Sequence, residues 1–116
     1  MTAKTHRTLL VIKTDPERDP RPAEGVRSAL GLVAGEIPLS VYLFREARPL
    51  LMASANDLED YQDGEVLKRF FPTLLQMAQK VYYEPDEAAF SPNTGEPLTL
   101  QELGRLLPTF DHTIVF

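Results

Sequence analysis

Four short apolar runs, separated by segments with helical periodicity, dominate the hydrophobic pattern of the chain. They are "RTLLVIK" (Arg7–Lys13), "PLSVYLF" (Pro38–Phe44), "KVYYE" (Lys80–Glu84) and "HTIVF" (His112–Phe116). Continuous runs of aliphatic, β-branched and aromatic residues are typical of strands buried on both faces of a sheet. The pattern therefore predicts a sheet of four to five strands.

Helical spacing of apolar residues marks the segments between these runs. The predicted helices lie between Pro22 and Gly35, over Ala47–Ala53, over Val66–Ala78 and over Leu100–Leu107. Glycines 31 and 35 have a spacing that favours close packing of the first helix against the sheet. Pro72 predicts a break near Phe71, because an internal proline removes a hydrogen bond and clashes with the preceding turn.

The last predicted helix has a clear start signal. Thr99 followed by Glu102 forms a capping box, and Leu98 with Leu103 fits a hydrophobic staple. Before this helix, "PDEAAF" can form one helical turn and "SPNTGEP" is a cluster of turn residues.

Strands that alternate with helices indicate a mostly parallel sheet covered on both faces, since parallel crossovers usually contain a helix. We therefore expect a single α/β domain over residues 1–116, a three-layer α/β/α sandwich. In such folds ligands bind beyond the carboxyl ends of the strands. The candidate ligand-binding or partner-binding residues at this edge are Lys13, Asp15, Arg45, Arg48, Tyr83 and Glu84.

The composition of the chain argues against several classes of function. The 116 residues include no cysteine, which excludes disulfides, thiolate metal sites and cysteine nucleophiles. The net charge is −5 and the 12 basic residues are scattered, so we expect no nucleic-acid partner. The start of the chain has only four consecutive aliphatic residues and no stretch reaches the length of a membrane span, so we expect a cytoplasmic protein.

Known catalytic and cofactor motifs are absent from the sequence. No Gly-x-Ser-x-Gly, Gly-x-Gly-x-x-Gly or Gly-Lys-Ser/Thr motif occurs, and an EF-hand around Gly64 fails because Phe70 stands where a carboxylate is required. His6 and His112 each precede a strand and therefore belong to the amino edge, opposite the expected site. We expect no metal, no cofactor and no enzymatic activity.

The order of these segments resembles the DsrE/DsrF-like family, which includes the TusB, TusC and TusD subunits of bacterial sulfur relay. The similar stretches, which together span nearly the whole chain, are "VRSALGLVAG", "SVYLFREARPLL", "VYYEPDEAAF" and "LQELGRLLPTFDHTIVF". The resemblance implies a parallel α/β/α fold and assembly into trimers or hexamers of like or related subunits. In active members it also implies a cysteine after the third strand that carries a persulfide.

This chain departs from the family pattern at that cysteine, because the matching position falls at Tyr83 or Glu84. Neither side chain can hold sulfane sulfur. The sequence therefore favours a non-catalytic subunit that acts by homo- or hetero-oligomer assembly, linked to sulfur relay, with Leu50, Leu51 and Met52 and nearby arginines as contacts.

Two alternatives to the subunit remain open. The first is a small-ligand or anion-binding module at the carboxyl edge, with Lys13, Arg45 and Arg48 as donors and Glu84 as an acceptor. The second is an enzyme that uses the carboxylates of Asp15 and Glu84, although no partner base or metal set supports it.

Overall fold

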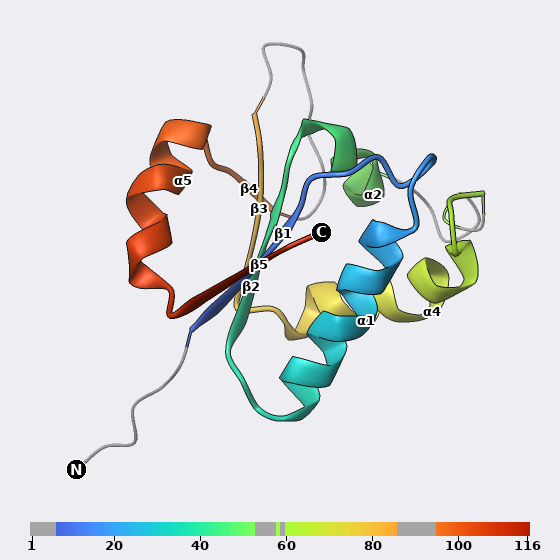
Figure 1. The fold of residues 1–116 in the computed structure, drawn as a ribbon, viewed down its shortest axis with the longest axis horizontal. Coiled ribbons are helices and arrows are strands. Elements are labelled where there is room, and N and C mark those ends of the chain that lie inside the picture. Colours follow the sequence, from blue (N-terminus) through green and yellow to red (C-terminus); the bar gives the residue numbers. More distant parts are fainter. Residues whose placement is uncertain (1–6, 53–57, 59, 86–94) are drawn as a thin grey trace.

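A five-stranded parallel sheet forms the centre of the computed structural model, which describes residues 7–52, 58, 60–85 and 95–116 (Figure 1). The strand order is β4-β3-β2-β1-β5. The strands are β1 (Thr8–Ile12), β2 (Leu39–Leu43), β3 (Lys80–Tyr83), β4 (Glu96–Pro97) and β5 (His112–Val115). Every pairing is parallel, so the predicted α/β sandwich is confirmed.

Helices cover the two faces of this sheet unequally. Figure 1 shows α1 (Arg21–Ala34), α2 (Pro49–Met52) and α4 (Gly64–Met77) on one side and α5 (Leu100–Leu106) on the other. Two short 3-10 helices complete the described elements, η1 (Arg45–Ala47) after β2 and η2 (Leu107–Thr109) after α5. The three layers follow from the strand pattern, because β1 and β2 are buried along their whole length.

The core has one part on each side of the sheet. Leu10 and Ile12 of β1 belong to the larger part, which α1 and α4 cover. Leu9 and Val11 point the other way and join Tyr42, Leu103 and Phe110 under α5 and η2. This alternation places neighbouring strand residues on opposite faces and fixes which side chains can meet.

The helical break predicted near Phe71 is wrong, since α4 (Gly64–Met77) runs without interruption through Pro72. Leu67, Phe71 and Leu74 are buried and form one continuous apolar face. Pro72 and Lys68 are exposed, so the Lys68 carbonyl that loses its usual donor lies on the solvent side. Burial of the opposite face therefore outweighs the local cost of the proline.

The start of α5 confirms the predicted capping box. The Glu102 backbone N–H donates to Thr99 Oγ1 at 3.1 Å, and the Thr99 N–H donates to Glu102 Oε1 at 3.0 Å. The hydrogen bond from the Thr99 backbone is the main cause that lowers the pKa of the Glu102 carboxyl. Leu98 packs against the core part that contains Leu103, as the staple requires.

Other expectations met different outcomes. The five strands agree with the predicted four to five, but the sequence did not locate β4, because it has only two residues and one of them is a proline. The "PDEAAF" turn lies outside the described residues from Asp86 onward, as does "SPNT" of the next cluster. Among the described segments, no helix combines the length and apolar character that crossing a membrane requires.

Candidate functional site at the carboxyl edge of the sheet

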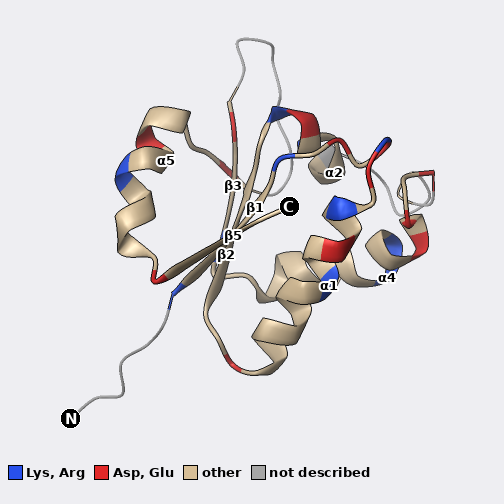
Figure 2. Ribbon diagram, in the orientation of Figure 1, with Lys and Arg blue, Asp and Glu red and all other residues tan. Residues whose placement is uncertain are grey.

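The ends of β1, β2 and β3 lie side by side at one edge of the sheet. Leu43 of β2 is in register with Ile12 of β1 and with Tyr83 of β3. The pairing continues one residue further, since the Glu84 N–H donates to the Leu43 carbonyl at 2.9 Å. Figure 2 shows charged residues of both signs following the ends of β1 and β2. Parallel pairing thus brings the segments after β2 and β3 together.

Glu84 is bound by the segment that follows β2. Its Oε1 accepts a hydrogen bond from the Arg45 backbone N–H at 3.0 Å, and its Oε2 lies 4.0 Å from Arg45 Nη2. The Glu84 side chain is 16% exposed and that of Arg45 is 55% exposed. The carboxylate therefore satisfies an N–H at the start of η1, where a negative charge is favoured.

Arg48 reaches the same strand end from inside the protein. Its Nη1 donates to the Glu84 backbone carbonyl at 2.9 Å, and the residue is only 9% exposed. A guanidinium that bridges two chain segments from a buried position fixes them relative to each other. The sequence placed Arg48 at this edge but gave no sign of its burial, which makes it unsuitable as a surface contact.

Tyr83 is also buried, with 8% exposure, and belongs to the larger core part. Its ring packs so close to Gly95 that a Cβ added there would lie 3.3 Å from the ring. Leu50 is 2% exposed and belongs to the same core part, so the expectation that it offers a surface contact is wrong. Leu51 is half-buried, and the Met52 side chain lies outside the described part of the structure.

Lys13 and Asp15 lie in the loop after β1. The Lys13 backbone N–H donates to the Phe116 carbonyl at 2.7 Å, and its side chain is exposed. Asp15 accepts the Glu17 N–H at 2.9 Å and lies 3.9 Å from Arg18 Nε. Asp15 therefore stabilises its own loop, and the structure brings together Arg45, Arg48 and Glu84 from the expected set.

Beneath the edge, the Tyr42 phenol lies on the α5 face of the sheet. Its O–H donates to the Leu98 carbonyl at 2.7 Å, and the residue has no exposed surface. Burial, followed by the charges of Glu84 and Glu102, raises the pKa of Tyr42 to about 12. A protonated phenol that donates to a backbone carbonyl acts here as a structural link between β2 and the segment before α5.

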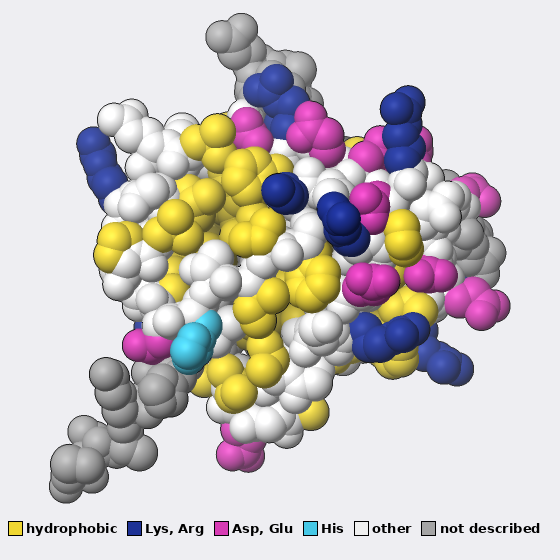
Figure 3. All heavy atoms as spheres, viewed as in Figure 1, with side chains coloured by type: hydrophobic (Ala, Val, Ile, Leu, Met, Phe, Trp, Pro, Cys, Tyr) yellow, Lys and Arg dark blue, Asp and Glu magenta, His cyan; other side chains and the backbone are white. Residues whose placement is uncertain are grey.

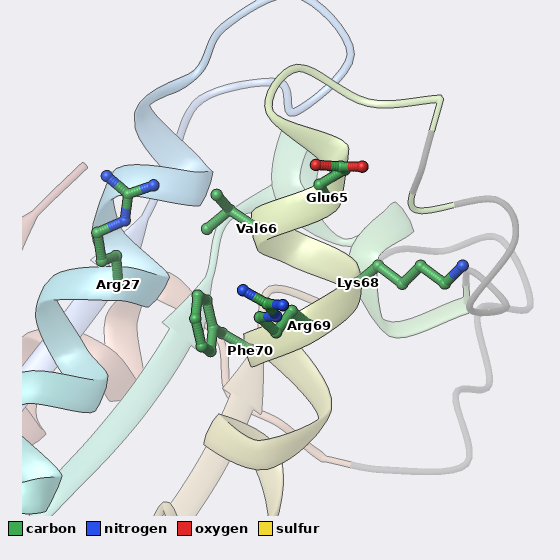
Figure 4. Close-up of a pocket in the computed structure, with 6 residues that line it drawn as sticks. All are labelled: Arg27, Glu65, Val66, Lys68, Arg69 and Phe70. Carbon is green, nitrogen blue, oxygen red and sulfur yellow. The ribbon is translucent and has the colours of Figure 1, made fainter.

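A hollow of about 530 Å³ lies away from this edge, over α1 and α4 (Figure 4). Its described lining consists of Arg27 from α1 and Glu65, Val66, Lys68, Arg69 and Phe70 from α4. The Arg69 guanidinium lies 5.8 Å from the centre of the Phe70 ring. Sequence reasoning missed this hollow because Arg27 is distant in sequence from the α4 cations and only helix packing brings them together.

A smaller hollow of about 330 Å³ lies beside β5, with a mostly apolar lining. Thr8, Leu32, Ile37, His112 and Ile114 form its described lining. His112 is at the start of β5 and so at the amino edge, as expected. Among residues 7–52, 58, 60–85 and 95–116, no group of three or more histidines and carboxylates is placed to hold a metal ion.

Comparisons with known proteins give a fold and no family assignment. No protein-family model matches the chain, and no curated protein matches it. The crystal structure of the YchN protein from E. coli superposes with a TM-score of 0.74 and 17% identity, over 97% of this chain and 100% of YchN. At this identity the similarity shows that the chain shares the fold of YchN.

Proposed function

We propose that this chain is a non-catalytic DsrE/DsrF-like subunit that acts by assembly in the cytoplasm. It forms a trimer or hexamer of identical copies, or joins related DsrE-like subunits of a sulfur relay in which a partner supplies the cysteine. The fold shared with YchN and the four similar sequence stretches support this proposal. Because fold alone does not determine function, the proposal depends on the contacts of the site residues.

The main support for the proposal is that Arg45, in the segment after β2, binds the Glu84 carboxylate. Active family members have a thiol where this chain has the end of β3, and here a carboxylate accepts the Arg45 N–H at 3.0 Å. Arg48 is held by the backbone of the same residue at 2.9 Å. A carboxylate offers no sulfur nucleophile and disfavours an incoming thiolate or persulfide. These contacts support a structural role for the position.

Native mass spectrometry tests the assembly directly. We expect the purified protein to have a mass that is a multiple of 13.1 kDa, or to form a complex with a cysteine-bearing DsrE-like protein when mixed with extract of its source cells. A protein that stays monomeric in both samples would contradict the proposal.

Anion binding is a second candidate function, and the hollow over α1 and α4 favours it. Arg27 and Arg69 supply two positive charges against the single carboxylate of Glu65, Val66 and Phe70 supply apolar surface, and the Lys68 ammonium points away from Arg27 (Figure 4). This lining suits an anion attached to a small apolar group. The carboxyl edge is less suitable, because Arg45 and Arg48 already bind Glu84.

Thermal unfolding with phenyl phosphate tests this second candidate. We expect phenyl phosphate to raise the melting temperature more than inorganic phosphate does, and Arg27→Ala to remove the difference. Arg18→Ala is the control, since Arg18 is an exposed arginine that pairs with Asp15 outside the hollow. Equal shifts for the wild type and both variants would exclude the hollow as the binding site.

A further inference from the structure

The two edges of the sheet differ in how well they are protected from pairing with another strand. At one edge, β4 is only two residues long, contains Pro97 and carries an ion pair in which Glu96 Oε1 lies 3.2 Å from Lys80 Nζ. Short strands, prolines and charges are the usual means by which proteins protect an edge. This edge is therefore unsuited to accept a strand.

At the other edge of the described sheet, β5 is longer, with four residues, and contains no proline. β5 has the sequence His-Thr-Ile-Val, and no strand lies beyond it in the described part of the chain. Thr113 and Val115 are exposed, and Val115 is 52% exposed. Figure 3 shows hydrophobic side chains gathered between α5 and the centre of the sheet, on the face to which Val115 belongs. Thr113, Ile114 and Val115 have β-branched side chains without charge, so this part of the strand is suited to pairing.

The hydrogen bonds of β5 show which of its backbone groups face outward. The His112 N–H donates to the Arg7 carbonyl at 3.2 Å, and the Phe116 N–H donates to the Val11 carbonyl at 2.8 Å. Because backbone groups alternate direction along a strand, Ile114 also bonds inward to β1. The N–H and C=O groups of Thr113 and Val115 therefore point toward the open edge.

We propose that β5 pairs in antiparallel fashion with β5 of a second copy, about a two-fold axis at Ile114. This inference rests on the proposed function, because it assumes that the chain assembles with itself. Thr113 and Val115 are placed symmetrically around Ile114, so Thr113 of each copy exchanges both backbone hydrogen bonds with Val115 of the other. The result is a continuous ten-stranded sheet with four new hydrogen bonds at its centre.

The side chains that meet in this register favour a second copy as the occupant. Ile114 lies on the α1 face beside the apolar hollow formed with Leu32 and Ile37. The two-fold axis brings the two hollows together, and each copy contributes an isoleucine that buries the other. The pairing thus covers apolar surface on the α1 face as well as Val115 on the α5 face.

The charges at the ends of the strand are complementary in the same register. Asp111, whose carboxylate accepts the Arg7 backbone N–H at 2.7 Å, precedes β5, and in the antiparallel pair it lies at the end where Phe116 of the second copy lies. Lys13 bonds to Phe116 through its backbone, so Lys13 of the second copy lies near Asp111. The Arg7 guanidinium is 4.5 Å from the Phe110 ring and donates to the Thr109 carbonyl, which directs its charge toward η2.

A two-fold contact is compatible with the expected hexamer, whereas a trimer of identical copies contains no two-fold axis. The contact closes a dimer by itself, and it also joins two trimers into a hexamer.

A single introduced cysteine tests the register, because the chain has no cysteine of its own. Facing Ile114 residues form a non-hydrogen-bonded pair with Cα atoms about 4.5 Å apart, within the range that a disulfide spans. Val115 of one copy lies opposite Thr113 of the other, which is two positions from the second Val115. The Cα atoms of the two Val115 residues therefore lie about 8 Å apart and cannot be bridged by a disulfide. We expect mild oxidation to give a covalent dimer of Ile114→Cys and no dimer of Val115→Cys.

A charge at the edge tests the assembly itself. We expect Val115→Lys to halve the native mass, whereas Leu100→Lys, at an α5 residue with a similar exposure of 50%, leaves it unchanged. One outcome overturns the β5 contact and leaves the proposed function in place: the wild type is oligomeric, but Val115→Lys keeps the native mass and Ile114→Cys gives no covalent dimer. If the wild type is monomeric alone but binds a related subunit, the contact is overturned as well. If it binds nothing, both fail.

Discussion

The Glu84 carboxylate at the end of β3 accepts the backbone N–H of Arg45 after β2, at 3.0 Å. This contact joins two strand ends that are 39 residues apart in sequence. It places a negative charge at the start of η1, on a side chain that is 16% exposed. The Glu84 side chain therefore links the ends of β2 and β3 and is part of the internal structure of this edge.

Replacement of Glu84 by alanine should destabilise the protein. Glu84→Ala removes the acceptor for the Arg45 N–H and the partner of the Arg45 guanidinium. We expect a loss of about 1.5–3 kcal/mol in the free energy of unfolding, the range for a hydrogen bond to a charged group. Urea denaturation measures it.

Glu96→Ala is the matched control, since Glu96 pairs with Lys80 through side chains that are 59% and 55% exposed. Exposed pairs contribute little, so we expect a change of less than about 1 kcal/mol. If both variants lose the same free energy of unfolding, the Glu84 contacts stabilise the protein no more than an exposed ion pair does.

Introduction of a cysteine at the end of β3 should give a reactive thiol. In Glu84→Cys the sulfur lies at the position of Glu84 Cγ, two bonds short of the oxygens that the Arg45 N–H and guanidinium approach, and it faces the same two groups. Both groups favour the thiolate, so we expect the pKa of this thiol to fall below the ordinary value of about 8.5. The pH dependence of iodoacetamide alkylation measures it.

Glu96→Cys provides the comparison, because β4 is exposed along both of its residues. We expect its thiol to be alkylated with an ordinary pKa. If both thiols show the same pH dependence, the groups at the end of β3 do not stabilise a thiolate there.

The strands and the candidate edge could be predicted because they depend on local signals. Aliphatic runs such as Thr8–Ile12 are buried at every position, and alternation with helices indicates parallel pairing. Parallel pairing then requires the segments after β2 and β3 to meet at one edge. The amino-acid sequence is therefore sufficient to place Arg45 and Glu84 together.

Other features depend on packing that the sequence does not encode locally. The α4 helix continues through Pro72 because its opposite face is buried against the core. Arg48 has the same local signal as Arg45, yet Arg48 is 9% exposed and the Arg45 side chain is 55% exposed. Only the path of η1 and α2 decides which arginine turns inward.

The glycines of α1 give a paired test of packing. A Cβ added to Gly25 would lie 2.9 Å from Phe116 Cγ, whereas one added to Gly31 would meet nothing within 4 Å. The predicted close packing at Gly31 is therefore wrong, and the close contact is at Gly25. We expect Gly25→Ala to destabilise by about 1–3 kcal/mol through overpacking, and Gly31→Ala to stabilise by about 0.5–1 kcal/mol through helix propensity. Thermal and urea unfolding measure both, and the same sign for the two changes would contradict the packing of Phe116 on α1.

The stability of the protein at high pH should depend on the ionisation of the buried Tyr42 phenol. Its pKa is raised from 10.0 to about 12, first by burial and then by Glu84 and Glu102. The folded protein thus keeps a proton that the unfolded chain releases, so the stabilisation is complete below pH 10 and is lost as the pH rises through about 12.

Tyr42→Phe isolates this contribution, because it removes the titrating group and leaves the ring. At pH 7 we expect the variant to be less stable by about 1 kcal/mol, since the Leu98 carbonyl loses the O–H that donates at 2.7 Å. Between pH 10 and 12 the free energy of unfolding should fall more steeply for the wild type, so the difference between the two proteins narrows and then changes sign. Urea denaturation across this range measures the difference. Parallel curves would mean that the Tyr42 phenol ionises alike in the folded and unfolded chains, and that its burial does not hold the proton.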